Sequence, residues 1–250
     1  MRGFQTIRYQ AADGLAAITL ARSDKRNAID RRMFDELAEA AQTAADDPDV
    51  LGVLVAGEGP SFCAGIDLGL LGEITGIDRD AFRDTIRHLQ RPFLRLATMP
   101  KPTVAAVQGH AVGAGCQLAL ACDLRVAAGD ARFAILEPRY GLVPDLGGVH
   151  RLTHLLGPSR AKELVWTTRQ VDAEEALRLG LVNRLSTPEQ LQGDATALLT
   201  EATAHSPTVV ELTKGLIDGA VGSSFADQLE RDADAQVIAV MGNPGTDRGE

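Results

Sequence analysis

Hydrophobic and polar positions follow two different periods in the early part of the chain. Apolar and polar side chains alternate in 5–9 and again in 15–20, which predicts two strands joined by a turn at 12–14. Over 29–45 the apolar side chains recur every four positions instead, which predicts an amphipathic helix. The apolar run 50–56 is bounded by proline and glycine and predicts a buried strand.

Glycine and proline mark the boundaries of the elements that follow. Six glycines make the segment 57–76 rich in loops. The elements expected after it are a helix over 79–98, strands over 103–107, 124–127 and 132–135, and a helix over 113–121. From residue 149 onward only helical patterns follow, over 149–155, 159–167, 173–179, 188–205, 207–222 and 224–241.

This order of elements favours the α/β class. Strand–strand–helix units come first and helices come last, which predicts a core over 1–190 and a C-terminal helical region over 191–250. The chain has 250 residues, of which 45% are hydrophobic, so it is long enough to bury a sizeable core.

Charge and cysteine content narrow the functional classes. The net charge of −9 argues against nucleic-acid binding, because that needs a basic surface. The cysteines Cys63, Cys116 and Cys122 are odd in number and have apolar neighbours, so we expect free thiols in a reducing, cytoplasmic compartment. The long apolar stretches are interrupted by Gly, Gln or Asp, and the first ten residues lack the apolar core of a signal peptide. We therefore expect no membrane partner.

Two segments rich in small residues follow predicted strands and present main-chain groups. The segment 61–68, Ser-Phe-Cys-Ala-Gly-Ile-Asp-Leu, would let a ligand approach the backbone closely. The segment 101–117 runs from a strand through Gly and Ala residues into a helix, whose first N–H groups lack partners and favour negative charge. Such donors can stabilise an oxygen that gains charge in a reaction. Each segment alone is also typical of a plain tight turn.

Two carboxylates, Glu137 and Asp145, lie eight residues apart in an otherwise apolar stretch. Burial there would raise their pKa values and suit them to general acid/base catalysis. The alternative is that each only caps a helix or a turn. Asp123 and Arg125 are interpreted as a structural pair. No cluster of Cys and His has zinc spacing, so no metal is expected.

In their order and spacing, these segments resemble those of the crotonase (enoyl-CoA hydratase/isomerase) superfamily. The resemblance extends to 156–164 and 180–183, and its most specific part is 101–123. It implies a spiral fold of strand–strand–helix turns with a C-terminal helical trimerisation region. It also implies trimers that pair into hexamers, and an acyl-CoA substrate whose coenzyme A is part of the substrate, with no separate cofactor.

The resemblance also implies a set of site residues. The family's two oxyanion donors fall on the backbone N–H groups of Ile66 and Ala114. The positions that match the CoA-binding residues are Arg22, Lys25, Ala28, Ala64, Asp67 and Leu68. The basic members of this set, with Arg26, would supply the positive patch that an acidic protein needs for phosphates. The alternatives are a solvated basic loop and, for Asp67, a structural cap.

The catalytic positions depart from those of the family's hydratases, which use two glutamates. The second glutamate falls on Glu137, but the first falls on Gln117, which cannot exchange a proton near neutral pH. Gln117 could at most orient a water or a substrate carbonyl. Asp145 falls where dienoyl-CoA isomerases carry a catalytic Asp, although those enzymes have a further Asp at the position of Gln117. The implied catalytic set is therefore Asp145, Glu137 and Gln117.

The leading hypothesis is an acyl-CoA double-bond isomerase that stabilises a thioester enolate and uses Asp145 and Glu137. The first alternative is an enoyl-CoA hydratase with a rearranged acid/base set of Glu137 and Gln117. The second is a non-catalytic acyl-CoA-binding protein, because one common glutamate is absent. Relatives usually continue with an acidic, Phe-containing tail where this chain has 243–250.

Overall fold

A two-stranded hairpin opens the chain in the computed structural model, which describes residues 3–242. The strands β1 (Ile7–Ala12) and β2 (Leu15–Leu20) pair antiparallel. Asp13 and Gly14 join them with φ values of 53° and 78°, and positive φ at both positions is what a two-residue type I′ turn requires. The hairpin predicted from the alternating pattern is confirmed.

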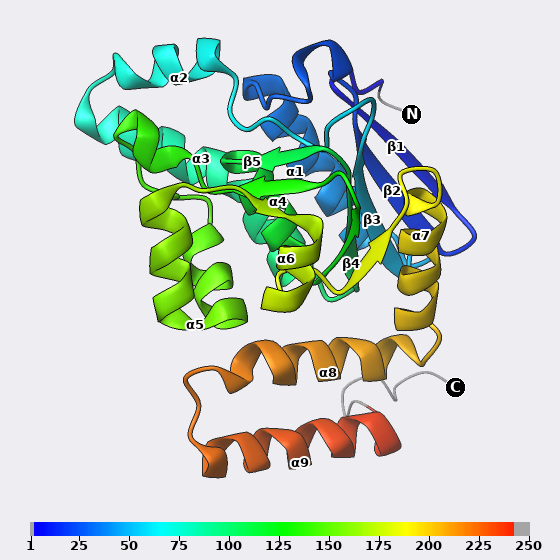
Figure 1. Cartoon of the computed structure of the whole chain (residues 1–250). Coiled ribbons are helices and arrows are strands. Elements are labelled where there is room, and N and C mark those ends of the chain that lie inside the picture. Colours follow the sequence, from blue (N-terminus) through cyan, green and yellow to red (C-terminus); the bar gives the residue numbers. More distant parts are fainter. Residues whose placement is uncertain (1–2, 243–250) are drawn as a thin grey trace.

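Six strands form the main sheet, in the order β1-β2-β3-β4-β6-β9 (Figure 1). Its remaining members are β3 (Gly52–Gly57), β4 (Thr103–Val107), β6 (Leu124–Ala128) and β9 (Arg184–Ser186). Every pair beyond the first hairpin is parallel, so each connection must cross over before the next strand. The smaller sheet contains β5 (His110–Val112), β7 (Arg132–Ala134) and β8 (Val171–Asp172).

Alternate residues of a strand point to opposite faces of the sheet, and in the central strands β3 and β4 both faces are buried. Val53 and Val55 belong to the larger hydrophobic core, to which the helices α1 (Arg31–Asp46) and α3 (Arg79–Thr98) contribute. Leu54 and Ala56 belong to a smaller core on the other face, which α7 (Leu191–Ala202) covers. Burial on two faces explains why β3 is apolar at successive positions.

Most helices have the bounds that the sequence pattern predicts, and α3 spans the expected 79–98. The two helices predicted over 149–155 and 159–167 are the halves of α5 (Gly148–Thr167), which breaks at Gly157, where φ is 75°. Within residues 3–242, no helix is both long and apolar enough to cross a lipid bilayer. Two further helices are α4 (Ala114–Ala121) and α6 (Ala173–Leu179).

One helix was not expected from the pattern. The segment 57–76, predicted to be loop-rich because of its glycines, contains α2 (Leu68–Thr75). Asp67 caps its first turn by accepting a main-chain N–H bond, and Leu70 and Ile74, one turn apart, are buried. Burial of this face outweighs the low helix propensity of the glycines.

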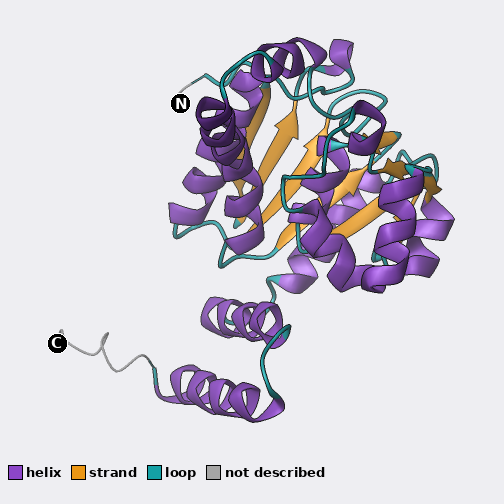
Figure 2. Cartoon of the chain, turned by 90° about the vertical axis from the view of Figure 1, so that its left-hand side faces the viewer, coloured by secondary structure: helices purple, strands orange, loops and turns teal. Residues whose placement is uncertain are grey.

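The last two helices stand apart from the sheets. α8 (Pro207–Ala220) and α9 (Phe225–Met241) pack on each other below the rest of the chain (Figures 1 and 2). Among their residues only Ala235 is buried. The predicted division at residue 190 groups α7 with these two helices, whereas α7 packs on the main sheet. The segment 243–250, where this sequence is expected to differ from the acidic, Phe-containing tail of its relatives, lies outside the described residues.

The buried guanidinium of Arg125 completes the end of α4. It donates to the carbonyl oxygens of Ala119 and Cys122 at 3.3 and 2.7 Å and to that of Leu181 at 2.6 Å. The last carbonyls of a helix have no partner inside it, so these donors satisfy groups that would otherwise be buried without one. The expected structural pair of Asp123 and Arg125 is made through the main chain, because Arg125 donates to the carbonyl oxygen of Asp123, at 3.3 Å.

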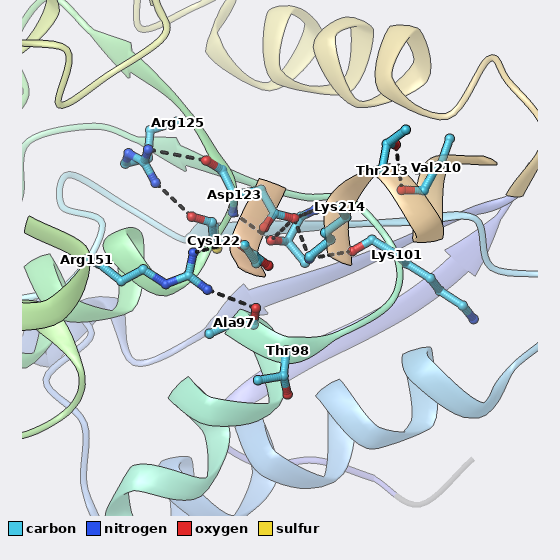
Figure 3. A network of polar contacts seen from close by, with 12 residues as sticks. Ala97, Thr98, Lys101, Cys122, Asp123, Arg125, Arg151, Val210, Thr213 and Lys214 are labelled. Carbon is cyan, nitrogen blue, oxygen red and sulfur yellow. Dashed lines mark hydrogen bonds and ion pairs between the residues drawn. The ribbon is translucent and has the colours of Figure 1, made fainter. Parts of the chain in front are cut away.

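The carboxylate of Asp123 instead anchors α8 to the core (Figure 3). It accepts from Lys214 at 2.7 Å and from the main chain and hydroxyl of Thr103 at 2.8 and 3.0 Å. Lys214 also donates to the carbonyl oxygen of Lys101 at 3.1 Å. A half-buried ion pair with additional hydrogen bonds thus fixes where α8 leaves the body of the molecule.

Candidate active site

The segment 61–67 lies against the start of α4 through main-chain hydrogen bonds. The N–H of Cys63 donates to the carbonyl of His110 at 2.8 Å, and the N–H of Val112 donates back to the carbonyl of Cys63 at 3.1 Å. A Cβ atom at Gly115 would lie only 2.3 Å from the carbonyl oxygen of Cys63. The two segments can therefore approach this closely only because residue 115 is glycine.

The two N–H groups expected as oxyanion donors are both free in this arrangement. Within residues 3–242 the N–H of Ile66 has no hydrogen-bond partner, while its neighbours Gly65 and Asp67 bond to Ile29. The N–H of Ala114 belongs to the first turn of α4, where no partner exists inside the helix. A Cβ at Gly65 would lie 3.7 Å from the nitrogen of Ala114, so the structure brings the two segments together.

Glu137 lies next to this donor pair. It begins a short 3-10 turn (Glu137–Tyr140) after β7, and a Cβ at Gly113, the residue before Ala114, would lie 3.5 Å from its Oε1 atom. Oε1 accepts from the side-chain amide of Gln117 at 2.7 Å. Oε2 is buried and has no partner in the described chain. Burial raises the pKa of Glu137, and an uncompensated buried carboxylate oxygen of this kind is typical of functional sites.

Asp145 approaches the same site from the loop that precedes α5. The amide of Gln90, on α3, donates to its carbonyl oxygen at 2.7 Å and so fixes the main chain of this loop. Burial raises the pKa of the Asp145 carboxyl. The charge of Asp145 in turn contributes to the raised pKa of Glu137, so the two acids lie within electrostatic range of each other.

Gln117 joins the two acidic segments. Its carbonyl oxygen accepts the N–H groups of Leu146 and Gly148 at 2.9 and 3.0 Å, and its amide nitrogen donates to Glu137. The side chain is buried on α4, with 1% of its surface exposed. We expected that it could orient a water or a substrate carbonyl, but in this structure its oxygen and its nitrogen both bond within the protein.

The CoA-binding candidates are brought together, though not all of them are free. One guanidinium nitrogen of Arg22 bonds to Asp67 at 3.1 Å and to the carbonyl of Ala28 at 2.6 Å, which joins the basic loop to the start of α2. Asp67 also caps α2, as the structural alternative proposed. Lys25 is exposed and, within the described chain, has no ion pair.

Ala64 and Leu68 complete this surface. Ala64 donates its N–H to the carbonyl of Arg26 at 2.9 Å, so the segment that carries the expected oxyanion donor is tied to the basic loop. Leu68 opens α2 with 71% of its side chain exposed. Arg26 is exposed beside Lys25, and together they leave two positive charges on this surface.

Several residues that support the site were not found from the sequence. Gln90 lies on an ordinary amphipathic helix, and nothing in its local pattern indicates that it contacts the loop of Asp145. Gly148 has no room for a side chain, because a Cβ atom would lie 2.7 Å from the side-chain amide oxygen of Gln117. The Gly147-Gly148 pair was visible in the sequence, but its partner is 31 residues away.

The thiols near the site are not poised as nucleophiles. Burial raises the pKa values of Cys63 and Cys116 to about 12, so both are protonated near neutral pH. This fits their interpretation as small apolar residues.

A cavity of about 960 Å³ lies between α3, α4, α5 and α8. Gln117 and Asp145 form part of its wall, together with apolar residues such as Phe93 and Ile217. Ile66, Ala114 and Glu137 do not line it. The cavity therefore lies on the α8 side of the Asp145 loop, and the oxyanion donors are not part of it.

Comparison with known proteins identifies the family. The model of the family described as enoyl-CoA hydratase/isomerase matches residues 10–241. A short-chain-enoyl-CoA hydratase of Clostridium acetobutylicum is 35% identical, over 82% of this chain and 77% of that protein. A crotonyl-CoA hydratase of Syntrophomonas wolfei is 31% identical, over 93% and 88%. A Thermobifida fusca protein solved in complex with CoA is 35% identical, with a TM-score of 0.87 over 94% of this chain and 93% of that one.

The chain belongs to the enoyl-CoA hydratase/isomerase family, within the crotonase superfamily. The expected crotonase-like fold of repeated strand–strand–helix units is confirmed by the likeness to these solved structures. The protein is therefore an enzyme of that family.

Proposed function

We propose that this enzyme moves the double bond of an enoyl-CoA thioester. Glu137 and Asp145 transfer the proton, and the N–H groups of Ile66 and Ala114 hold the thioester oxygen. The observation that carries this proposal is the engagement of Gln117. Its oxygen accepts two main-chain N–H groups and its nitrogen donates to Glu137, and an amide cannot take up a proton near neutral pH, so Gln117 cannot act as the base that activates water. Glu137 and Asp145 then remain as the proton-transfer groups.

The reaction needs no group beyond these. A carboxylate removes a proton from the carbon next to the double bond, and the C–H electron pair moves toward the thioester carbonyl. The oxygen gains negative charge, which two main-chain donors stabilise. A carboxylic acid then returns a proton further along the acyl chain, so that atoms and charge are unchanged overall. Carboxyls whose pKa values are raised toward neutrality suit both steps.

The names of the relatives favour a second candidate, hydration of a 2-enoyl-CoA. Relatives in Clostridium acetobutylicum and Syntrophomonas wolfei are called hydratases. In this chain the buried Oε2 of Glu137, which lacks a partner in the described residues, is the group that would accept a hydrogen bond from water. Hydration would then depend on Glu137 with Asp145, because Gln117 cannot supply a second carboxylate.

Several features support the coenzyme A thioester as substrate. The Thermobifida fusca structures contain CoA and acetoacetyl-CoA. In this chain Lys25 and Arg26 place two exposed positive charges beside the segment that carries Ile66, where they can meet the phosphates of CoA. Arg22 supports this surface through its bonds to Asp67 and Ala28.

We also propose that α8 and α9 form the contacts of a trimer, which can pair into a hexamer. Their exposed apolar side chains include Ile217, Phe225 and Val240, with exposed fractions of 71%, 80% and 69%. An apolar surface of this kind is typical of a contact between subunits. The three cysteines are free and buried, which fits the proposed cytoplasmic location.

The test is to mix the protein with a medium-length 3-enoyl-CoA and to follow the absorbance of the conjugated thioester. We expect the absorbance to rise, and to rise far more slowly in Asp145→Asn, with CoA-ester binding by calorimetry little changed. If Asp145→Asn keeps its turnover, the assignment of Asp145 is wrong. If nothing rises although the ester binds, 2-enoyl-CoA hydration is assayed next. Turnover there supports the hydratase, and its absence supports a binding protein.

A further inference from the structure

We infer that Gln117 is a positioning residue, which holds Glu137 as an oriented hydrogen-bond acceptor and ties it to the loop that carries Asp145. This inference rests on the proposed function, because it assigns Glu137 and Asp145 to proton transfer. Gln117 reaches both segments at once: its nitrogen is 2.7 Å from Glu137, and its oxygen is 2.9 and 3.0 Å from the nitrogens of Leu146 and Gly148.

The orientation of the Gln117 amide follows from its partners. Main-chain N–H groups can only donate, so the atom that faces Leu146 and Gly148 must be the amide oxygen. The amide nitrogen then necessarily faces Glu137 and can only donate to it. The side chain therefore favours a carboxylate at Glu137 over a carboxylic acid whose proton points toward Gln117.

The surroundings leave no room for another arrangement. The side chain of Gln117 is buried on α4, and a Cβ atom at Gly148 would lie 2.6 Å from its Cγ atom. Gly113 also lies close to Glu137, because a Cβ atom at Gly113 would be 3.5 Å from Oε1 of Glu137. The carboxyl of Glu137 is thus confined between the oxyanion donor segment and Gln117, and only its second oxygen, Oε2, is uncommitted.

Two other titratable groups lie near Glu137. The charge of Asp145 raises the pKa of Glu137, and the charge of Glu137 in turn raises the pKa of the Cys116 thiol. Burial raises the pKa of that thiol to about 12, so Cys116 stays neutral across the useful pH range. The pKa of Glu137 is therefore raised chiefly by burial and also by the charge of Asp145, while the main-chain N–H groups of Glu137 and Leu136 and the amide of Gln117 lower it.

Substitution of Gln117 by glutamate tests this role, because the new side chain is a donor only while its carboxyl is protonated. In Gln117→Glu, a protonated carboxyl at position 117 can accept from Leu146 and Gly148 and still donate to Glu137, as the amide does. When that proton leaves, two carboxylates face each other across a hydrogen-bond distance and repel. Gln117→Met has a similar length but neither donor nor acceptor, so it cannot recover at any pH.

The experiment compares the native protein with Gln117→Glu, Gln117→Met and the matched control Gln228→Met. Gln228 is also a side-chain amide that donates to a carbonyl and to a carboxylate, but it lies on α9. Three quantities are measured in each: turnover of a 3-enoyl-CoA against pH, binding of an acyl-CoA by calorimetry, and protonation of Glu137 by infrared titration. The infrared band of Glu137 is assigned by its absence in Glu137→Gln.

We expect Gln117→Glu to approach native turnover at the acidic end of the range and to lose it as pH rises. Gln117→Met should lose about 10²-fold at every pH, the effect of a misplaced catalytic group, with acyl-CoA binding retained. The infrared titration should show a raised pKa for Glu137 in both variants and an unchanged one in Gln228→Met.

The inference is overturned if Glu137 titrates alike in all four proteins, or if Gln117→Glu loses the same fraction of turnover at every pH. Should Gln117→Met fail to fold, Gln117→Glu alone still decides the question. The infrared result does not depend on which reaction is catalysed. A raised pKa of Glu137 in a protein that does not isomerise 3-enoyl-CoA would support the role of Gln117 and reject the proposed function.

Discussion

The two halves of the candidate site are built from different parts of the chain. The oxyanion half consists of main-chain N–H groups, at Ile66 and Ala114, held in place by hydrogen bonds between backbone segments. The acid half consists of the side chains of Glu137 and Asp145. The amide of Gln117 bonds to the carboxyl of Glu137, and the amide of Gln90 bonds to the main-chain carbonyl of Asp145.

This difference determines which substitutions each half of the site tolerates. A main-chain donor does not depend on its own side chain, so the oxyanion half tolerates substitution at the donors but not where the backbones touch. In the acid half, under the proposed mechanism, each side chain supplies the chemistry directly. The acid half is held in place by hydrogen bonds, and the loss of one of them leaves buried polar groups without partners.

The largest effect is expected for Glu137→Gln, which removes an acid and keeps the shape of the side chain. General acid/base groups contribute on the order of 10²–10⁴-fold, so turnover of the enoyl-CoA should fall by about that factor. Absorbance assays of the conjugated thioester measure the loss of turnover, and calorimetry should give an acyl-CoA affinity within a few-fold of that of the native protein. Undiminished turnover would mean that the reaction does not require the carboxyl of Glu137.

Gly115→Ala should damage the oxyanion half without touching either donor. The new Cβ would meet the carbonyl oxygen of Cys63 at 2.3 Å and push the segment of Ile66 away from that of Ala114. We expect a loss of turnover of about 10²–10³-fold, the effect of losing one oxyanion donor, and a destabilisation of about 1–3 kcal/mol.

The matched control for this substitution is Gly129→Ala. Gly129 lies in the exposed turn after β6, and a Cβ there meets nothing within 4 Å. Denaturant unfolding and turnover are measured for both variants. Equal behaviour of the two proteins would show that the close approach at Gly115 has no functional importance.

The acid half should also make stability depend on pH. Burial raises the pKa of Glu137 in the folded chain, so between the unfolded and folded pKa values the native state holds a proton that the unfolded state has released. The free energy of unfolding therefore falls as pH rises through this window, by ~1.4 kcal/mol for each unit of pKa difference. Asp145 acts in the same direction.

Denaturant unfolding of native and Glu137→Gln protein between acidic and neutral pH measures this effect. The variant should gain stability relative to the native protein as pH rises, because its amide never becomes a buried charge, whereas Glu137 does when it loses its proton. The matched control is Glu230→Gln, on the exposed surface of α9, which should keep the native pH dependence. A pH-independent difference between native and Glu137→Gln would contradict the burial of this carboxyl.

The smallest effect is expected for Ala114→Gly. The donor is the main-chain N–H, which glycine retains, so turnover should stay close to native. The cost is limited to the greater flexibility of glycine at a helix start, below about 1 kcal/mol. Steady-state kinetics and thermal unfolding measure both quantities. A large loss of turnover would show that the Ala114 side chain itself contributes, and the contrast between the two halves would weaken.

Much of the fold could be predicted, because burial leaves a regular pattern in the chain. The hairpin, α3 and β4 appear at or near the expected residues, since each places apolar side chains at the period of its own element. The helix α2 was missed because glycine lowers helix propensity locally, and its stabilisation comes from burying Leu70 and Ile74 in the core.

The site was predicted unevenly for the same reason. The segments that contain Ile66 and Ala114 could be found because small residues follow strands there, and Glu137 and Asp145 because carboxylates stand out in apolar surroundings. The partners of Gln117 could not be found, because a hydrogen bond to residues 20 to 31 positions away leaves no local pattern.

The sequence by itself determined the class of fold and the family and predicted which residues act as the acids, since periodicity and motif spacing are properties of neighbouring residues. Only the tertiary structure decided that Gln117 bonds to both acidic segments, that Arg125 caps α4 with its guanidinium, and that Asp123 holds Lys214. Apart from the bonds of Arg125 to the helix end that precedes it, these contacts join residues far apart in the chain. They exist because buried polar groups must find partners wherever folding brings one within reach.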